Sequence, residues 1–117
     1  MYIVNTSFMV EPVVHSRWYD LFEHRFIPYL RSSGFGTAPY RIVFTRVLTD
    51  TGDSHHTYSL QVEVLDTGEY QRFMQEVMGE YATIARPLFG EKVLYFTTLL
   101  KPIDLCPTTE TTDTDEK

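Results

Sequence analysis

The strongest constraint on the fold is the order in which two kinds of hydrophobic periodicity follow one another along the chain. Apolar residues alternate with the period of a strand in four segments and recur with the period of a helix in two, in the order β-α-β-β-α-β. This order predicts two β-α-β units with right-handed crossovers, joined through a central hairpin. We therefore expect an α+β domain, a ferredoxin-like βαββαβ sandwich with both helices on one face of an antiparallel four-stranded sheet.

The segment boundaries follow from turn and capping residues. We expect strands over residues 2–10, 40–49, 55–64 and 92–100, and helices from residue 11 to about 33 and from 66 to about 90. The turn of the hairpin should occupy residues 50–54. Residues 1–101 should form the domain, and residues 102–117 an acidic, Thr-rich disordered tail, because the region from Pro107 onward contains no large apolar residue.

Each expected helix has an apolar stripe on an ideal helical wheel. In the first helix the stripe also contains Arg25, and Phe26 lies at its margin. Pro28 should kink its last turn, because proline cannot donate a hydrogen bond to the carbonyl of His24. The stripes consist of Val14, Trp18, Leu21, Phe22 and Tyr29 in the first helix, and of Tyr70, Phe73, Met74, Val77, Tyr81, Ile84, Ala85 and Leu88 in the second.

The two faces of the strands differ in polarity. The face with Val4, Phe8, Tyr58, Leu60 and Val62 should lie under the helices. The other face combines the apolar Ile3 and Met9 with four polar residues. It is too apolar to be fully exposed to water and too polar to form a hydrophobic core. Packing two such sheets together would cover this face, so we expect a homodimer that forms a dimeric α/β barrel. The cavity between the sheets would be lined by Asn5, Ser7, Ser59 and Gln61, and could hold a small-molecule ligand.

Composition limits the partners and the compartment. The chain has 117 residues, enough for one domain, and a net charge of −6, which disfavours binding to nucleic acid or to an anionic membrane surface. The single cysteine, Cys106, excludes an internal disulfide, so a reducing cytoplasmic location fits best. No apolar run approaches the roughly 20 residues of a membrane span, and the N-terminus lacks the features of a signal peptide.

Several short motifs together resemble a known family. They are Asn5 in the opening strand, Trp18 ten residues before Pro28, the sequence Ser33-Gly34-Phe35, the sequence Arg46-Val47-Leu48, and the closing Phe96-Thr97-Thr98-Leu99-Leu100. The chain resembles, over residues 1–101, a family of short bacterial proteins known only as a domain of unknown function, within the dimeric α/β-barrel superfamily. The resemblance implies the barrel fold and the dimer, and it implies no established activity.

Cofactor-independent monooxygenases of the same superfamily use an Asn, a Trp and a polar or basic partner to hold an aromatic substrate beside oxygen. Similarity to them makes Asn5, Trp18, His15 and His24 candidate catalytic residues for an oxygenase or isomerase acting on a small aromatic or ketonic compound. The simpler interpretation is that Trp18 belongs to the core and Asn5 pairs across the sheet or the dimer. We favour this interpretation, which makes the protein a small-ligand-binding or structural module.

The chain lacks the sequence motifs that are typical of hydrolases, kinases, dehydrogenases and metal-binding proteins. It has no P-loop, nucleophile elbow, dinucleotide-binding glycine pattern or pair of catalytic carboxylates, so we expect no cofactor. The histidines show no metal-ligand spacing on a helix, and the adjacent His55 and His56 should point to opposite faces of a strand. We therefore expect no metal site.

Overall fold

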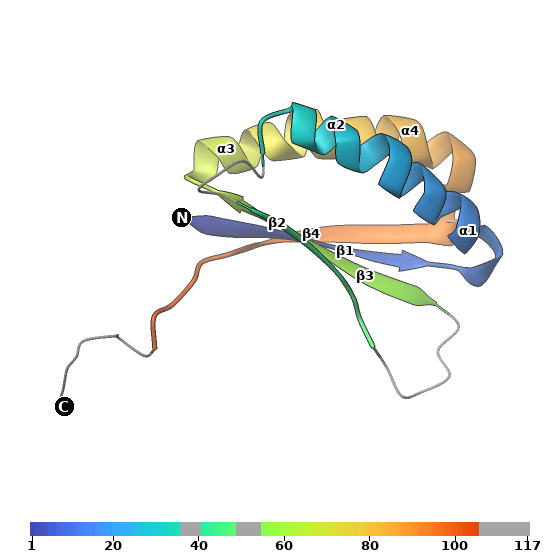
Figure 1. Ribbon diagram of the computed structural model, residues 1–117, viewed down its shortest axis with the longest axis horizontal. Helices are drawn as coiled ribbons and strands as arrows, with labels where there is room; N and C mark the ends of the chain where they lie inside the picture. Colours follow the sequence, from blue (N-terminus) through green and yellow to red (C-terminus); the bar gives the residue numbers. More distant parts are fainter. Residues whose placement is uncertain (36–40, 49–54, 106–117) are drawn as a thin grey trace.

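The computed structural model describes residues 1–35, 41–48 and 55–105. Their fold is α+β: an antiparallel sheet with two helices packed against one of its faces (Figure 1). The expected α+β class, with an antiparallel four-stranded sheet and two helices, is therefore confirmed in the described residues. The predicted hairpin turn at residues 50–54 and the part of the predicted tail from Cys106 onward lie outside the described residues.

The described part of the chain forms a four-stranded sheet in the order β2-β3-β1-β4, in which every neighbouring pair is antiparallel. Its central strand β1 places Ser7 opposite Ser59 of β3 on one side and opposite Phe96 of β4 on the other. Of the strand expected over 40–49, the structure describes residues 41–48, and within them β2 ends at Arg46, although Val47 still donates its backbone N–H to the carbonyl of Thr57. The strands are β1 Tyr2–Val10, β2 Ile42–Arg46, β3 His56–Val64 and β4 Val93–Leu100.

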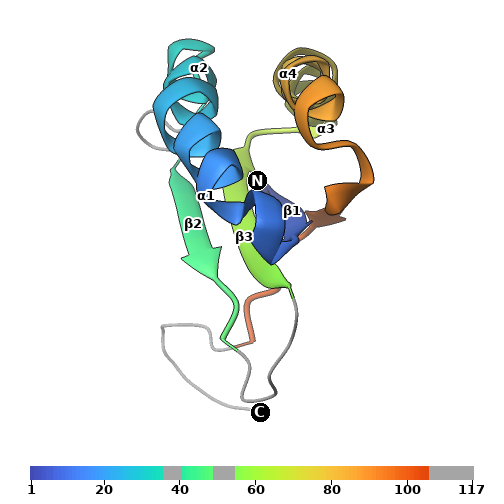
Figure 2. The same cartoon turned by 90° about the vertical axis from the view of Figure 1, so that its right-hand side faces the viewer.

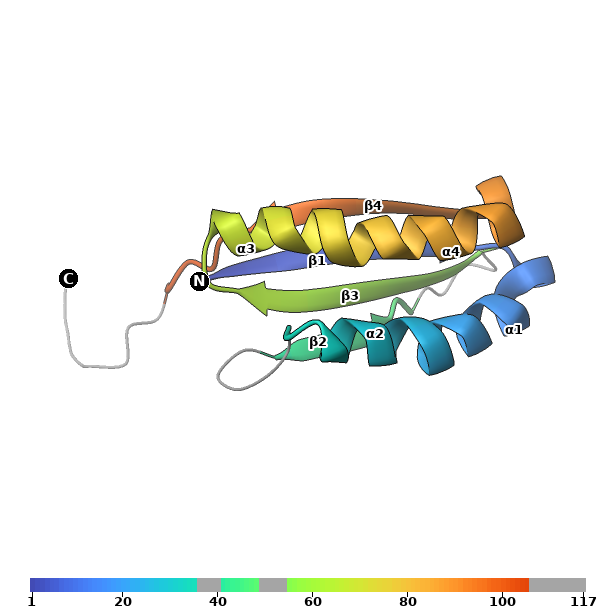
Figure 3. The same ribbon diagram turned by 90° about the horizontal axis from the view of Figure 1, so that it is seen from above.

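The two helices lie side by side above the sheet. Figures 2 and 3 show the first helix over the β2–β3 half and the second over the β1–β4 half. Each helix contains a π-helical segment in its middle. The first helix consists of α1 Pro12–Leu21, η1 Phe22–Phe26 and α2 Ile27–Ser32, and the second of α3 Thr67–Arg72, η2 Phe73–Met78 and α4 Gly79–Phe89, with a 3₁₀ turn, η3 Gly90–Lys92, before β4.

Apart from Met78, the buried residues of both helices recur at steps of four residues. They are Val14, Trp18, Phe22, Phe26 and Leu30 in the first helix, and Phe73, Val77, Tyr81, Ala85 and Phe89 in the second. On an ideal α-helix each such step overshoots a full turn by about 40°, so the stripe would wind away from the sheet. The wider π turns take up part of this overshoot; for example, the N–H of Ile27 reaches the carbonyl of Phe22, five residues back.

The π segments also explain where the ideal wheel was wrong. Phe26, expected at the margin of the stripe, is fully buried, whereas Arg25, expected within it, is exposed. In the second helix Leu88 is 56% exposed and the neighbouring Phe89 takes the buried position. Pro28 lies just after η1, and the helix continues past it to Ser32. The backbone therefore changes from π-helical to α-helical hydrogen bonding immediately before Pro28, the residue at which a kink was expected.

Residues typical of helix caps stand at the start of the second helix and at the ends of both helices. The Asp66 side chain accepts a hydrogen bond from the N–H of Glu69, and the Glu69 carboxylate accepts one from the N–H of Leu65. Gly34 follows the first helix with φ 95° and Gly90 follows α4 with φ 55°, both in the region that glycine adopts without strain. These residues mark the points where the second helix begins and where both helices end.

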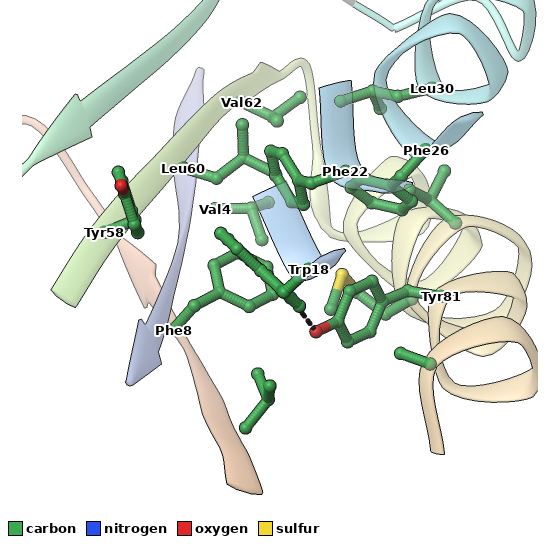
Figure 4. Close-up of a cluster of buried hydrophobic side chains, with 14 of the residues drawn as sticks. Val4, Phe8, Trp18, Phe22, Phe26, Leu30, Tyr58, Leu60, Val62 and Tyr81 are labelled. Carbon is green, nitrogen blue, oxygen red and sulfur yellow. Dashed lines mark hydrogen bonds between the residues drawn. The ribbon is translucent and has the colours of Figure 1, made fainter. Parts of the chain in front are cut away.

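The centre of the core is an aromatic cluster that joins the two helices to the sheet. Phe8 of β1 lies 5.5 Å from Trp18 and 5.2 Å from Tyr81, measured between ring centroids. Above it, Nε1 of Trp18 donates a hydrogen bond of 2.9 Å to the hydroxyl of Tyr81 (Figure 4). Burial raises the pKa of Tyr81 above its ordinary value, so the phenol stays protonated. The hydrogen bond between Trp18 and Tyr81 thus joins the two helices inside the core, and both of its groups are uncharged.

Replacing Tyr81 with Phe should destabilise the protein. The substitution Tyr81→Phe keeps the ring but leaves the buried indole N–H of Trp18 without its acceptor, at a cost of about 1–3 kcal/mol in the free energy of unfolding. Urea denaturation followed by circular dichroism measures this loss, and Tyr2→Phe at the half-buried first residue of β1 serves as the control. Equal stability of the Tyr81→Phe variant and the unmodified protein would contradict the assigned role of the hydrogen bond.

Candidate functional site

The four residues predicted to line a cavity form one patch on the face of the sheet that the helices leave uncovered. Asn5 lies opposite Gln61, and Ser7 lies opposite Ser59 in the pairing of β1 with β3. Ser59 Oγ donates a hydrogen bond of 2.6 Å to Oδ1 of Asn5. All four side chains are partly exposed. We call these residues the polar patch.

Large apolar side chains border the polar patch on its β4 side. Phe96 is 55% exposed and lies opposite Ser7, Leu94 is 49% exposed and lies opposite Met9, and Leu100 is 37% exposed. These residues alternate with Tyr95 and Leu99, which point toward the helices and pack against the core. The uncovered face is thus a polar centre with an apolar flank.

The four candidate catalytic residues do not meet in one site. Trp18 is fully buried between the helices and the sheet, whereas Asn5 lies on the opposite face of the sheet. His24 points to solvent with its side chain 70% exposed, and its Nδ1 lies 3.1 Å from Oδ1 of Asp20. His15 lies near Tyr58 at the edge of the helix-covered face. The structure therefore separates Asn5, Trp18 and His24 from one another.

His15 belongs to a cluster that sequence reasoning missed. Its ring stacks on the ring of His56 with centroids 3.8 Å apart, and its Nε2 lies 2.7 Å from the hydroxyl of Tyr58. Arg46 Nη2 lies 3.1 Å from Nδ1 of His56. Because a guanidinium only donates hydrogen bonds, Nδ1 of His56 must be the acceptor. The four residues come from α1, β2 and β3, and we call them the histidine cluster.

The electrostatics of the histidine cluster favour the neutral form of His15. Burial is the largest cause that lowers the pKa of His15 below its ordinary value of 6.5, followed by the nearby His56 and Arg46. Burial raises the pKa of Tyr58, so its hydroxyl also stays protonated near neutral pH. His15 and Tyr58 thus form a hydrogen bond between two neutral groups, and Arg46 supplies the positive charge of the cluster.

Neither a metal site nor a membrane span is found in the part of the chain that the structure describes. Within residues 1–35, 41–48 and 55–105, no three side chains of the types His, Cys, Asp and Glu gather in a way that would hold a metal ion. None of the helices in the same ranges combines the length and the apolar composition that crossing a membrane requires.

Fold and site together define a small α+β domain with one sheet face under two helices and one face open around a polar patch. The chain belongs to the family DUF4286, described as a domain of unknown function, whose model matches residues 1–103. A comparison with curated proteins finds no match. The expectation of an uncharacterised family is therefore confirmed, and the family itself carries no activity to transfer.

The lowered pKa of His15 makes stability depend on pH. The unfolded chain binds a proton at His15 near pH 6.5, whereas the folded chain resists it, so the unfolded state carries more protons just below that pH. This contribution is complete above pH 6.5 and is lost as the pH falls through the lowered pKa. Replacing His15 with Gln should remove this part of the pH dependence.

The measurement is urea denaturation at intervals from pH 7.5 to about 5, a range that spans the ordinary histidine pKa of about 6.5. The free energy of unfolding of the His15→Gln variant should fall less steeply with acidification than that of the unmodified protein. The exposed His24, replaced with Gln, is the matched control. Parallel curves for the His15→Gln variant and the unmodified protein would exclude the assigned environment of His15.

Proposed function

We propose that the protein is a homodimeric small-ligand-binding module in which two ferredoxin-like protomers pair through their uncovered sheet faces as a dimeric α/β barrel. The observation that carries the proposal is the uncovered face itself, a polar patch flanked by exposed Leu94, Phe96 and Leu100. The element order β-α-β-β-α-β and the strand order β2-β3-β1-β4 support the ferredoxin-like topology.

The apolar flank favours a second copy as the partner of this face. Removing apolar surface from water contributes about 25 cal/mol per Å², and stable interfaces bury about 800 Å² on each partner. Two copies related by a two-fold axis would bring Phe96 and its neighbours onto the same face of the other copy. Pairing would also cover the side chains that an isolated sheet leaves exposed.

Charge on the uncovered face does not oppose pairing. Among the residues of the four strands that point to this face, Glu63 is the charged one, and it lies 3.4 Å from the guanidinium of Arg41. The net charge of −6 is therefore carried elsewhere on the chain. Two identical sheets can approach without the repulsion that this net charge would otherwise cause.

The polar patch determines what the space between the sheets could hold. Buried amides and hydroxyls need hydrogen-bond partners, and Asn5 and Gln61 each provide an amide with donors and an acceptor. The contact between Ser59 and Asn5 satisfies one of these groups within the protomer. The remaining groups would bind either their copies across the dimer or a small neutral ligand with several hydrogen-bonding atoms.

No observation supports the oxygenase hypothesis beyond the resemblance. The indole N–H of Trp18 already donates to Tyr81, and the polar patch with Asn5 lies on the other face of the sheet. We therefore propose a binding function, with the cytoplasmic location as a prediction from composition.

A charge placed on the uncovered face should break the dimer. Light scattering coupled to gel filtration should give the unmodified protein twice the chain mass of 13.7 kDa, and the Phe96→Glu variant a single chain mass. Leu88→Glu is the matched control, because Leu88 is 56% exposed on the outside of the second helix and Phe96 is 55% exposed on the sheet. A monomeric unmodified protein, or a Phe96→Glu variant that stays dimeric, would refute the proposed interface.

A further inference from the structure

A groove runs between the first helix and the edge strand β2, on the helix-covered side of the sheet. It consists of two adjoining pockets that share Tyr19 of α1 and Phe44 of β2. The first pocket, of about 520 Å³, is otherwise largely apolar, with Phe22, Ile27, Pro28 and Ile42 in its wall. The second, of about 420 Å³, is completed by His15, Arg46 and Tyr58. We call the two together the edge groove.

The strand register explains why the edge groove exists. Ile42, Phe44 and Arg46 lie opposite Val62, Leu60 and Tyr58 of β3, so their side chains share the helix-covered face. β3 is buried beneath the first helix, but β2 has no strand on its outer side in the described sheet. The side chains of β2 are therefore only partly covered, and Arg46 is exposed.

The walls of the edge groove suit a flat aromatic group. The ring of Phe44 stacks on Phe22 with centroids 4.7 Å apart and on Tyr58 with centroids 5.2 Å apart. Tyr19 faces this stack from the helix, 5.8 Å from Tyr58. Aromatic pairs prefer such offset or tilted contacts, and rigid rings lose little conformational entropy when a ligand binds.

The end of the groove at Arg46 suits an anion. The polar groups of the second pocket belong to Arg46, His15, Tyr58 and Tyr19, and among the residues that the structure describes no acidic side chain lines it. His56 positions the guanidinium of Arg46 by accepting one hydrogen bond, which leaves further N–H donors for a carboxylate. In the first pocket Glu23 and Arg31 have opposite charges, so the net positive charge of the groove lies at the Arg46 end.

We propose that the edge groove is a binding site for a planar aromatic carboxylate, with the ring against Phe44 and Tyr19 and the carboxylate on Arg46. Both pockets have volumes in the range of about 300–1,000 Å³ that is typical of small-molecule sites. The site goes beyond the proposed function, because it lies on the helix-covered side of the sheet and does not depend on the pairing of two uncovered faces.

The test is isothermal titration of the full chain with 1-naphthoate and with its uncharged counterpart 1-naphthamide. The carboxylate should bind at least tenfold more tightly than the amide, and Arg46→Gln should abolish this difference. Arg25→Gln is the matched control, because Arg25 is exposed on the first helix and lines neither pocket of the edge groove. Its binding of 1-naphthoate should stay within about threefold of the unmodified protein, a difference of about 0.7 kcal/mol.

Three outcomes would overturn the proposal: no binding of 1-naphthoate at millimolar concentration, equal affinity for the amide, or equal losses in the Arg46→Gln and Arg25→Gln variants. Circular dichroism confirms that each variant is folded, and the comparison of the two compounds on the unmodified protein does not depend on any variant. The Phe96→Glu variant separates this site from the dimer, since a monomer should still bind 1-naphthoate.

Discussion

The structure depends on one packing constraint. Each of the two helices must keep its apolar stripe against the same face of a twisted sheet over its whole length. Both helices meet it with buried residues at steps of four, from Val14 to Leu30 and from Phe73 to Phe89, and with a π segment in the middle of each. Phe8, Trp18 and Tyr81 join the two stripes at the centre. Because both helices pack on this face, the other face of the sheet is free to contact water or a partner.

The two candidate sites follow from this division. Strand alternation puts the polar patch and Phe96 on the uncovered face, where a second copy can bury them. At the β2 edge the first helix covers its neighbour strand only in part, and this leaves the edge groove with Phe44 in its wall and Arg46 at its end. We thus propose one face of the sheet for self-association and the edge of the other face for a small ligand.

Alternation along each strand made the uncovered face predictable, because Asn5, Ser7, Ser59 and Gln61 need only the period of a strand and antiparallel pairing to lie together. The wheel of an ideal α-helix misplaced Phe26 and exchanged Leu88 for Phe89, since no local signal marks a π segment. The histidine cluster was beyond sequence reasoning. His15 and His56 stack only because the angle of α1 and the register of β3 bring them together, and neither follows from their spacing along the chain.

The central claim is that the uncovered face of the sheet belongs to a second copy of the chain. Isotope-filtered nuclear Overhauser spectroscopy on an equal mixture of ¹³C-labelled and unlabelled protein tests it most directly, because only contacts between copies give signals. The account predicts cross-peaks between copies that involve Phe96, Leu94 and the polar patch. Cross-peaks that instead join the outer surfaces of the helices, or the absence of any signal between copies, would contradict it.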